Sequence, residues 1–278
     1  MAFRTILSVT GPDQGEDDLR RAADLCDRSG AHLSILVMAL AAPPPIGEYA
    51  VMVSDAWFEE QQADLAELEK RTAAVTAFLA GRETSGDVAS QYSELALADD
   101  AIGRRARYAD LTVIGPELLA SGVLGAKIVE GGLFWSARPL LLVPQGHVPT
   151  LEPKRVTVAW DASMEAAGAV GAAIDVLRGA EQVRIALVDP EEGEDAHGAE
   201  PGADLAAYLA RHGVKVSVDR LAGGGRPPAE MLRRHAGDTA AQLLVMGAYG
   251  HSRLRERIFG GVTRSMIAEP PLPVLMAR

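Results

Sequence analysis

The chain has 278 residues, of which 48% are hydrophobic and 5% aromatic, and its formal net charge is −11. This length suffices for two domains, and the acidic balance disfavours binding to nucleic acid or to an anionic membrane surface. The single cysteine, Cys26, excludes an intrachain disulfide and a cysteine-rich metal site. Because no apolar stretch reaches the length of a membrane span and the N-terminus lacks a signal-peptide pattern, we expect a cytoplasmic protein.

Three segments of the first half recur in the second half in the same order. This repetition predicts two copies of one domain, residues 1–146 and 153–278, joined by a polar, proline-containing linker. The corresponding segments are 4–10 and 155–161, 109–115 and 241–247, and 138–144 and 272–277.

The first copy alternates strand and helix patterns along its whole length. Short apolar or alternating runs predict strands, and apolar residues at a spacing of three or four predict helices. The helix expected over 55–82 is much longer than any helical pattern in the second copy. The predicted strands are 3–9, 31–40, 87–95, 111–115 and 139–143, and the predicted helices are 16–28, 55–82, 98–108 and 127–136.

The second copy repeats this order more compactly. Strands that alternate with helices predict an α/β fold with a parallel sheet and helices on both faces. Ligands of such sheets bind beyond the carboxyl ends of the strands, where Asp161 and Gly247 are both expected. The predicted strands are 156–160, 183–188, 214–221, 242–246 and 273–276, and the predicted helices are 164–178, 203–211, 228–235 and 262–268.

A glycine-punctuated loop joins a predicted strand to the last predicted helix. Glycine allows a ligand to approach the backbone closely, and a helix N-terminus offers unpaired N–H groups with a partial positive charge. The loop therefore predicts an anion pocket for the phosphates of a nucleotide, although turn glycines and solvated arginines are the plainer alternative. Its glycines are Gly247, Gly250, Gly260 and Gly261, and the cationic residues between them are His251, Arg253, Arg255 and Arg257.

The spacing of these glycines resembles the G-x2-G-x9-G-[ST] signature of the universal stress protein family, whose ATP-binding members hold the triphosphate in this loop. Gly261 replaces the Ser or Thr of the signature, and a hydroxyl returns at Thr263. The resemblance implies ATP as the ligand, with or without Mg²⁺. The positions that it assigns to the ligand are Asp161, Leu187, Met246, Gly247, Gly250, His251, Arg253, Gly260, Gly261, Val262 and Thr263.

Several of these positions have structural alternatives. Asp161 either caps the following helix or binds adenine or ribose. Its expected position beside the glycine loop favours the ligand-binding role. Leu187 and Met246 either contact the ligand or fill the core. We expect one of His251 and Arg253 to contact phosphate.

The resemblance covers nearly the whole chain and also has structural implications. It implies two Rossmann-like, five-stranded domains of the adenine nucleotide alpha hydrolase type, paired through their fifth strands. The first copy is degenerate, because Thr10 stands in place of Asp161 and Leu118 in place of Gly250. We expect this copy to be structural or to recognise something else.

Other chemistry finds little support in the sequence. Walker, H-E-x-x-H and G-x-S-x-G motifs are absent, and Asp189 either reaches Mg²⁺ or, as we favour, caps a turn. We identify no catalytic residue. The expected function is therefore an ATP-binding regulator of the stress response, with an unknown protein partner and a homodimer as further expectations. The alternatives are a weak ATPase and a structural or partner-binding module without nucleotide.

Overall fold

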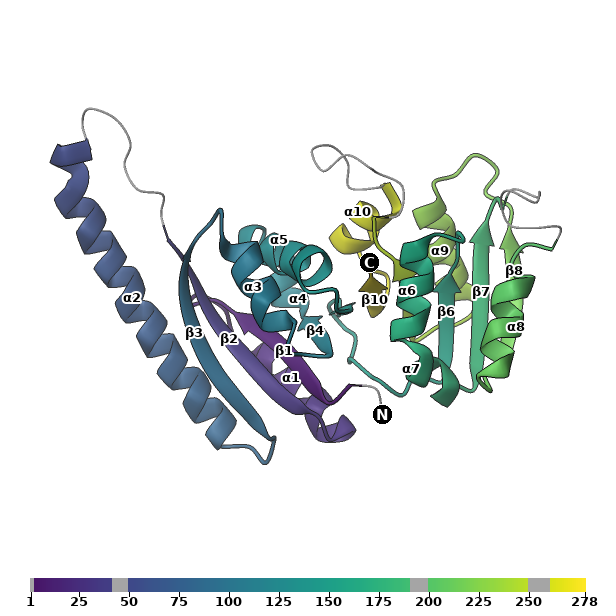
Figure 1. Cartoon of the computed structure of the whole chain (residues 1–278), viewed down its shortest axis with the longest axis horizontal. Coiled ribbons are helices and arrows are strands. Elements are labelled where there is room, and N and C mark those ends of the chain that lie inside the picture. Colours follow the sequence, from purple (N-terminus) through teal and green to yellow (C-terminus); the bar gives the residue numbers. More distant parts are fainter. Residues whose placement is uncertain (1–2, 42–49, 191–199, 250–260) are drawn as a thin grey trace. The chain divides into compact units, whose positions relative to one another are not determined.

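The computed structural model describes residues 3–41, 50–190, 200–249 and 261–278, with only the backbone described for 50–56. It divides into two compact units, one of residues 3–136 and one that contains residues 137–278 (Figure 1). Both units are layers of helices on a mostly parallel sheet, which confirms the predicted fold class. In the described part of the chain, no helix is long and apolar enough to cross a membrane.

The first unit has four parallel strands in the order β3-β2-β1-β4. Strands β1, β2 and β4 are almost fully buried, as expected for parallel strands covered on both faces. The elements are β1 (Thr5–Thr10), α1 (Asp17–Ser29), β2 (His32–Ala41), α2 (Ala50–Ala80), β3 (Gly86–Glu94), α3 (Ala98–Ala106), β4 (Leu111–Ile114), α4 (Pro116–Ala120), α5 (Val123–Glu130) and the π-helical turn η1 (Gly131–Trp135).

The second unit has six strands in the order β5-β10-β9-β6-β7-β8. All neighbours are parallel except β5 and β10, which pair antiparallel with Leu141 opposite Leu275. This confirms the predicted pairing of the two fifth strands. The elements are β5 (Leu140–Leu142), β6 (Arg155–Ala159), α6 (Met164–Ala172), α7 (Ile174–Gly179), β7 (Gln182–Val188), α8 (Ala203–Arg211), β8 (Val216–Leu221), α9 (Pro228–Asp238), β9 (Leu243–Gly247), α10 (Gly261–Ala268) and β10 (Val274–Ala277).

Four helical regions differ clearly from the prediction. Helix α2 begins at Ala50, before the predicted start at residue 55. The single helix predicted over 164–178 is divided at Ala173 into α6 and α7. The short helix α4 was not predicted, although Pro116 occupies a first-turn position that suits proline. The helix predicted over 127–136 begins earlier, as α5, and ends in the π-helical turn η1.

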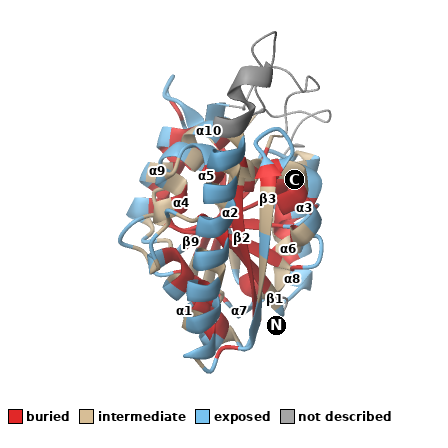
Figure 2. Ribbon diagram, turned by 90° about the vertical axis from the view of Figure 1, so that its left-hand side faces the viewer, coloured by how far each residue is buried: buried red, intermediate tan, exposed pale blue. Residues whose placement is uncertain are grey.

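The long helix α2 covers the sheet of the first unit with one narrow face. Its buried apolar residues Leu68, Val75 and Leu79 recur at helical spacing, whereas Phe58 and Leu65 are exposed. Figure 2 shows the buried strand β2 behind a helix whose outer face is largely exposed.

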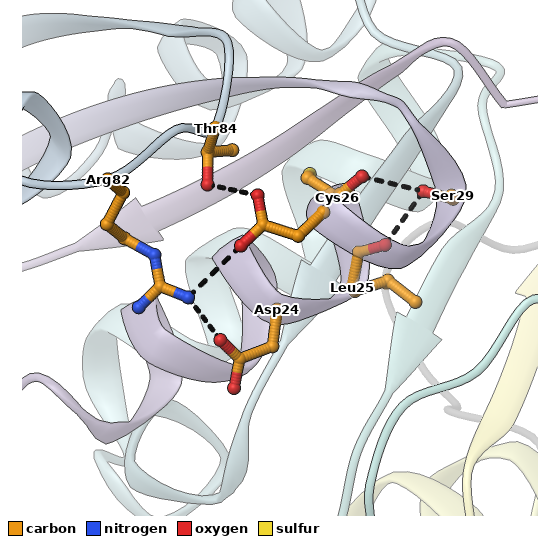
Figure 3. A network of polar contacts seen from close by, with 7 residues as sticks. Asp24, Leu25, Cys26, Ser29, Arg82 and Thr84 are labelled. Carbon is orange, nitrogen blue, oxygen red and sulfur yellow. Dashed lines mark hydrogen bonds and ion pairs between the residues drawn. The ribbon is translucent and has the colours of Figure 1, made fainter.

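A polar network fastens the C-terminal end of α2 to α1. The guanidinium of Arg82 binds both Asp24 and Asp27, and the hydroxyl of Thr84 donates to Asp27 (Figure 3). Cys26 lies buried on α1, and burial raises the pKa of its thiol to about 12. At neutral pH this thiol is therefore protonated and serves as a small apolar side chain.

A second polar cluster links α9 to the outer strands of the second unit. The carboxylate of Asp219 accepts hydrogen bonds from Nη1 of Arg184 at 3.0 Å and from Nε2 of His235 at 2.8 Å. Burial alone would raise the pKa of Asp219, but these hydrogen bonds and charges outweigh it and lower the pKa.

The lowered pKa of Asp219 predicts how acid affects this unit. A carboxylate with a lower pKa in the folded than in the unfolded state stabilises the fold above its unfolded pKa of about 3.9. That contribution disappears as the pH falls through the folded pKa. We expect the stability difference between wild type and Asp219→Asn, measured by urea unfolding, to be constant near pH 5 and to shrink below about pH 4. A difference that stays the same down to pH 3 would contradict this expectation.

Candidate functional site

The carboxyl ends of β6 and β9 form the edge at which the sequence predicts a ligand. These strands are neighbours, with Ala159 opposite Met246. Strand β6 also pairs with β7 on its other side, so the strand order switches direction at this point. Asp161 lies just after the end of β6, and Gly247 is the last residue of β9. Both residues therefore lie at the same edge of the sheet.

Asp161 is oriented by a turn at the start of α6. Its Oδ1 accepts from the backbone N–H of Ser163 at 3.1 Å and from the Ser163 hydroxyl at 2.6 Å. Ser163, in turn, caps the helix by accepting from the N–H of Ala166 at 3.1 Å. The helix cap is therefore Ser163 and not Asp161. Serine directly before a helical pattern is the usual signal for a cap, so the sequence could have predicted this role. The exposed carboxylate of Asp161 is held at the edge of the sheet.

Gly247 is required by packing within the protein. A Cβ at this position would lie 2.4 Å from the backbone N of Ala166 and 2.6 Å from the carbonyl carbon of Glu165. The first turn of α6 therefore lies directly against the end of β9. This contact explains the first glycine of the signature without any ligand.

Gly261, the first residue of α10, has the opposite surroundings. It is exposed, and among the described residues no heavy atom lies within 4 Å of the place where its Cβ would be. Neither a neighbouring side chain nor a left-handed φ angle requires glycine here. A side chain at position 261 would therefore meet none of the described residues.

Thr263 and Arg233 fix the position of α10. The buried hydroxyl of Thr263 accepts from the N–H of Tyr249 at 3.3 Å, which ties the end of the β9 segment to the first turn of the helix. At the other end, the Arg233 guanidinium donates to the carbonyl oxygens of Ser265 and Glu269. Such contacts satisfy the carbonyl groups that a helix C-terminus leaves unpaired.

The remaining candidates divide into core residues and residues that are not described. Leu187 and Met246 are 1% and 4% exposed, and both fill the core of the second unit. Val262 is partly exposed in the first turn of α10. Four predicted site residues lie outside the described residues: Gly250, His251, Arg253 and Gly260.

The carboxylate of Asp189 caps the turn that begins at Gly223, which is the role that we favoured from the sequence. Its Oδ1 accepts from the N–H of Gly223 at 2.8 Å, and a Cβ on Gly223 would lie 2.3 Å from the carboxylate. Among the described residues, no group of three or more His, Cys, Asp or Glu side chains is arranged to hold a metal ion.

At the corresponding edge of the first unit, a protein carboxylate occupies the backbone N–H groups at the start of α4. Asp18 accepts from the backbone N–H groups of Leu118 at 2.9 Å and Glu117 at 3.2 Å, at the start of α4. A Cβ on Gly115, which corresponds to Gly247, would lie 2.1 Å from Asp18 Oδ1. Burial raises the pKa of Asp18, although the two backbone hydrogen bonds act in the opposite direction. This contact could not be predicted from the sequence, because acidic residues are common in the first turn of any helix.

Comparison with known proteins agrees with this architecture. Residues 152–278 match the model of the universal stress protein family. The universal stress protein Slr1230 of Synechocystis is 37% identical over 70 residues, which are 25% of this chain and 23% of that protein. The matched stretch thus spans less than a quarter of the length of this curated relative.

Two solved structures resemble nearly the whole chain. One is a universal stress protein from Archaeoglobus fulgidus, with a TM-score of 0.63 at 17% identity, covering 98% of this chain and 96% of that chain. The other is a functionally unknown protein from Pseudomonas aeruginosa, with a TM-score of 0.55 at 16% identity, covering 99% and 93%. At these identities the likeness concerns the fold.

These findings define a tandem of α/β domains. The C-terminal part of the chain, residues 152–278, belongs to the universal stress protein family, and the N-terminal half folds as a similar domain. The resemblance inferred from the glycine spacing is thereby confirmed.

Proposed function

We propose that the second unit binds an adenine nucleotide, ATP, and that the chain acts as a nucleotide-dependent regulator of the stress response. The observation that carries this proposal is the start of α10 at Gly261, where no described heavy atom lies within 4 Å of the place of a Cβ and the first turn offers backbone N–H groups. These groups have no acceptor within the helix and carry its partial positive charge, so they suit a phosphate.

Two further features support the proposal. Asp161 presents an oriented carboxylate at the neighbouring strand end, where it can accept hydrogen bonds from ribose or adenine. Thr263 holds Tyr249 against α10 and so fixes the two ends of the glycine loop. The cationic residues His251 and Arg253 follow directly in the sequence and supply charge for the phosphates. Bound Mg²⁺, a protein partner, a homodimer and a cytoplasmic location remain predictions.

Two observations favour an alternative in which the domain binds partners without nucleotide. Leu187, which the family resemblance places against adenine, is closed off from solvent. Gly261 also lacks the hydroxyl of the signature. We therefore base the proposal on the backbone of α10, with weak ATP hydrolysis as the enzymatic alternative.

Calorimetric titration of ATP into the full chain tests the proposal, together with mass spectrometry of any ligand that the freshly purified protein releases. We expect one nucleotide per chain and no measurable turnover. No binding at millimolar ATP would favour the partner-binding alternative, whereas steady release of ADP would favour the ATPase.

Restoring the missing hydroxyl provides a sharper prediction. Gly261→Ser introduces a side chain that meets none of the described residues, and a hydroxyl that donates to a charged phosphate contributes about 1.5–3 kcal/mol. We expect Gly261→Ser to bind ATP roughly tenfold more tightly by calorimetry. Gly261→Ala is the matched control, because it adds the Cβ without the hydroxyl. Equal affinities of the two variants would remove position 261 from the phosphate site.

A further inference from the structure

A cavity of about 320 Å³ lies at the carboxyl ends of β1 and β2 in the first unit. The loop after β1, the end of β2, one face of α2 and the segment from Ser121 to Leu124 form its walls. Its volume falls at the lower end of the range for small-ligand pockets. Its position is also the edge at which parallel α/β sheets bind their ligands.

The lining combines an apolar wall with carboxylates. Met38, Leu40 and Leu124 contribute apolar surface. Asp13, Asp64 and Glu67 contribute negative charge from two different elements, the loop after β1 and helix α2. Among the described residues that line the cavity, none is lysine, arginine or histidine.

Two of these carboxylates have partners within the first unit. Asp64 accepts from the hydroxyl of Tyr92 at 3.0 Å, and burial together with Asp64 and Glu60 raises the pKa of Tyr92 to about 12. The tyrosine is therefore protonated at neutral pH and donates this hydrogen bond to Asp64. Glu67 pairs with Lys70 at 3.3 Å, but both side chains are mostly exposed, so solvent weakens this pair.

Arg71 of α2 binds the segment around the loop after β1 through one guanidinium nitrogen, and its buried Nε has no hydrogen-bond partner among the described residues. Nη2 of Arg71 donates to the carbonyl oxygen of Gly15 at 2.6 Å and to the hydroxyl of Thr10 at 3.3 Å. The backbone N–H groups at the start of α4 are already bound to Asp18. Among the described residues that line the cavity itself, the charged side chains are all carboxylates, which disfavour a phosphate there.

We propose that this cavity binds a small organic cation. Its ammonium group pairs with Asp13 and Asp64, and its apolar body lies on Met38, Leu40 and Leu124. The two copies of the fold thus take ligands of opposite charge at the same edge. This inference does not depend on nucleotide binding by the second unit, because its site is built entirely from residues of the first unit.

Two probes of the same shape test the proposal on the full chain. 2-Phenylethylammonium carries the cation and the apolar body, and 2-phenylethanol carries the same body without charge. By titration followed with NMR, we expect the ammonium compound to bind roughly tenfold more tightly than the alcohol and to weaken as salt is added. Equal affinities, or no binding of the ammonium compound at millimolar concentration, would overturn the proposal.

Paired variants distinguish the cavity from the general acidity of α2. Asp13→Asn with Asp64→Asn removes two lining charges but preserves side-chain shape. Glu59→Gln with Glu69→Gln removes two exposed charges of α2 that do not line the cavity. We expect the first pair to lose the roughly tenfold preference for the cation and the second to retain it. Equal losses in both pairs would show long-range attraction alone and overturn the proposed site.

Discussion

Replacing Gly247 with valine is expected to destabilise the second unit by roughly 3 kcal/mol, at the upper end of the usual cost of overpacking. The new side chain would meet backbone atoms of Glu165 and Ala166, which cannot swing away as the end of a flexible side chain can. Helix α6 would have to move away from β9. Urea unfolding followed by circular dichroism measures the loss.

Gly261→Val is the matched control for this substitution. It introduces the same side chain at the other end of the same loop, where no described heavy atom lies within 4 Å. We expect a change in stability within about 0.5 kcal/mol, as for most surface substitutions. If both variants are equally stable, the close contact between α6 and β9 does not govern this position. This difference between the two positions also affects binding experiments. A loss of ATP affinity in Gly247→Val would result from the destabilised fold and would not show that Gly247 contacts the ligand.

Gly250→Val is expected to weaken ATP binding by at least about 100-fold, or about 2.7 kcal/mol. The reason comes from the sequence, since the second glycine of the signature is where the backbone is expected to approach phosphate. Calorimetry measures the affinity, and a thermal melt checks that the variant is folded.

Leu118→Val in the first unit supplies the control for Gly250→Val. By the sequence repeat, position 118 corresponds to position 250, and the N–H of Leu118 is bound to Asp18. We expect a small loss of stability, because Leu118 is buried, and no change in ATP affinity. Unchanged affinity in Gly250→Val would exclude this glycine from the phosphate site, and reduced affinity in Leu118→Val would place nucleotide in the first unit.

The sequence predicted the fold because local patterns and the global architecture agree in this chain. Short runs such as Leu111–Ile114 are typical of strands buried on both faces, and the helix predicted over 203–211 is α8 itself. The order of these elements, repeated in both halves, was enough to predict parallel sheets. The pairing of β5 with β10 was implied by the family resemblance and is confirmed by the structure.

The candidate site was less predictable because its details depend on contacts between distant residues. Asp18 accepts a hydrogen bond from the N–H of Leu118, one hundred positions away, and no local sequence pattern predicts such a contact. The role of Gly247 likewise depends on Glu165 and Ala166, which reach β9 only in the folded unit. The spacing of glycines alone does not distinguish a glycine that allows a ligand to approach the backbone from one that allows a helix to pack against it.

The central claim is that backbone N–H groups at the start of α10 hold the phosphates of a nucleotide. NMR amide shifts of the full chain during an ATP titration test it most directly. We predict saturable shifts at Gly261, Val262 and Thr263, with much smaller changes at Glu117 and Leu118 in the first unit. Amide signals of α10 that stay unmoved at saturating ATP, or shifts centred on the first unit, would contradict the account.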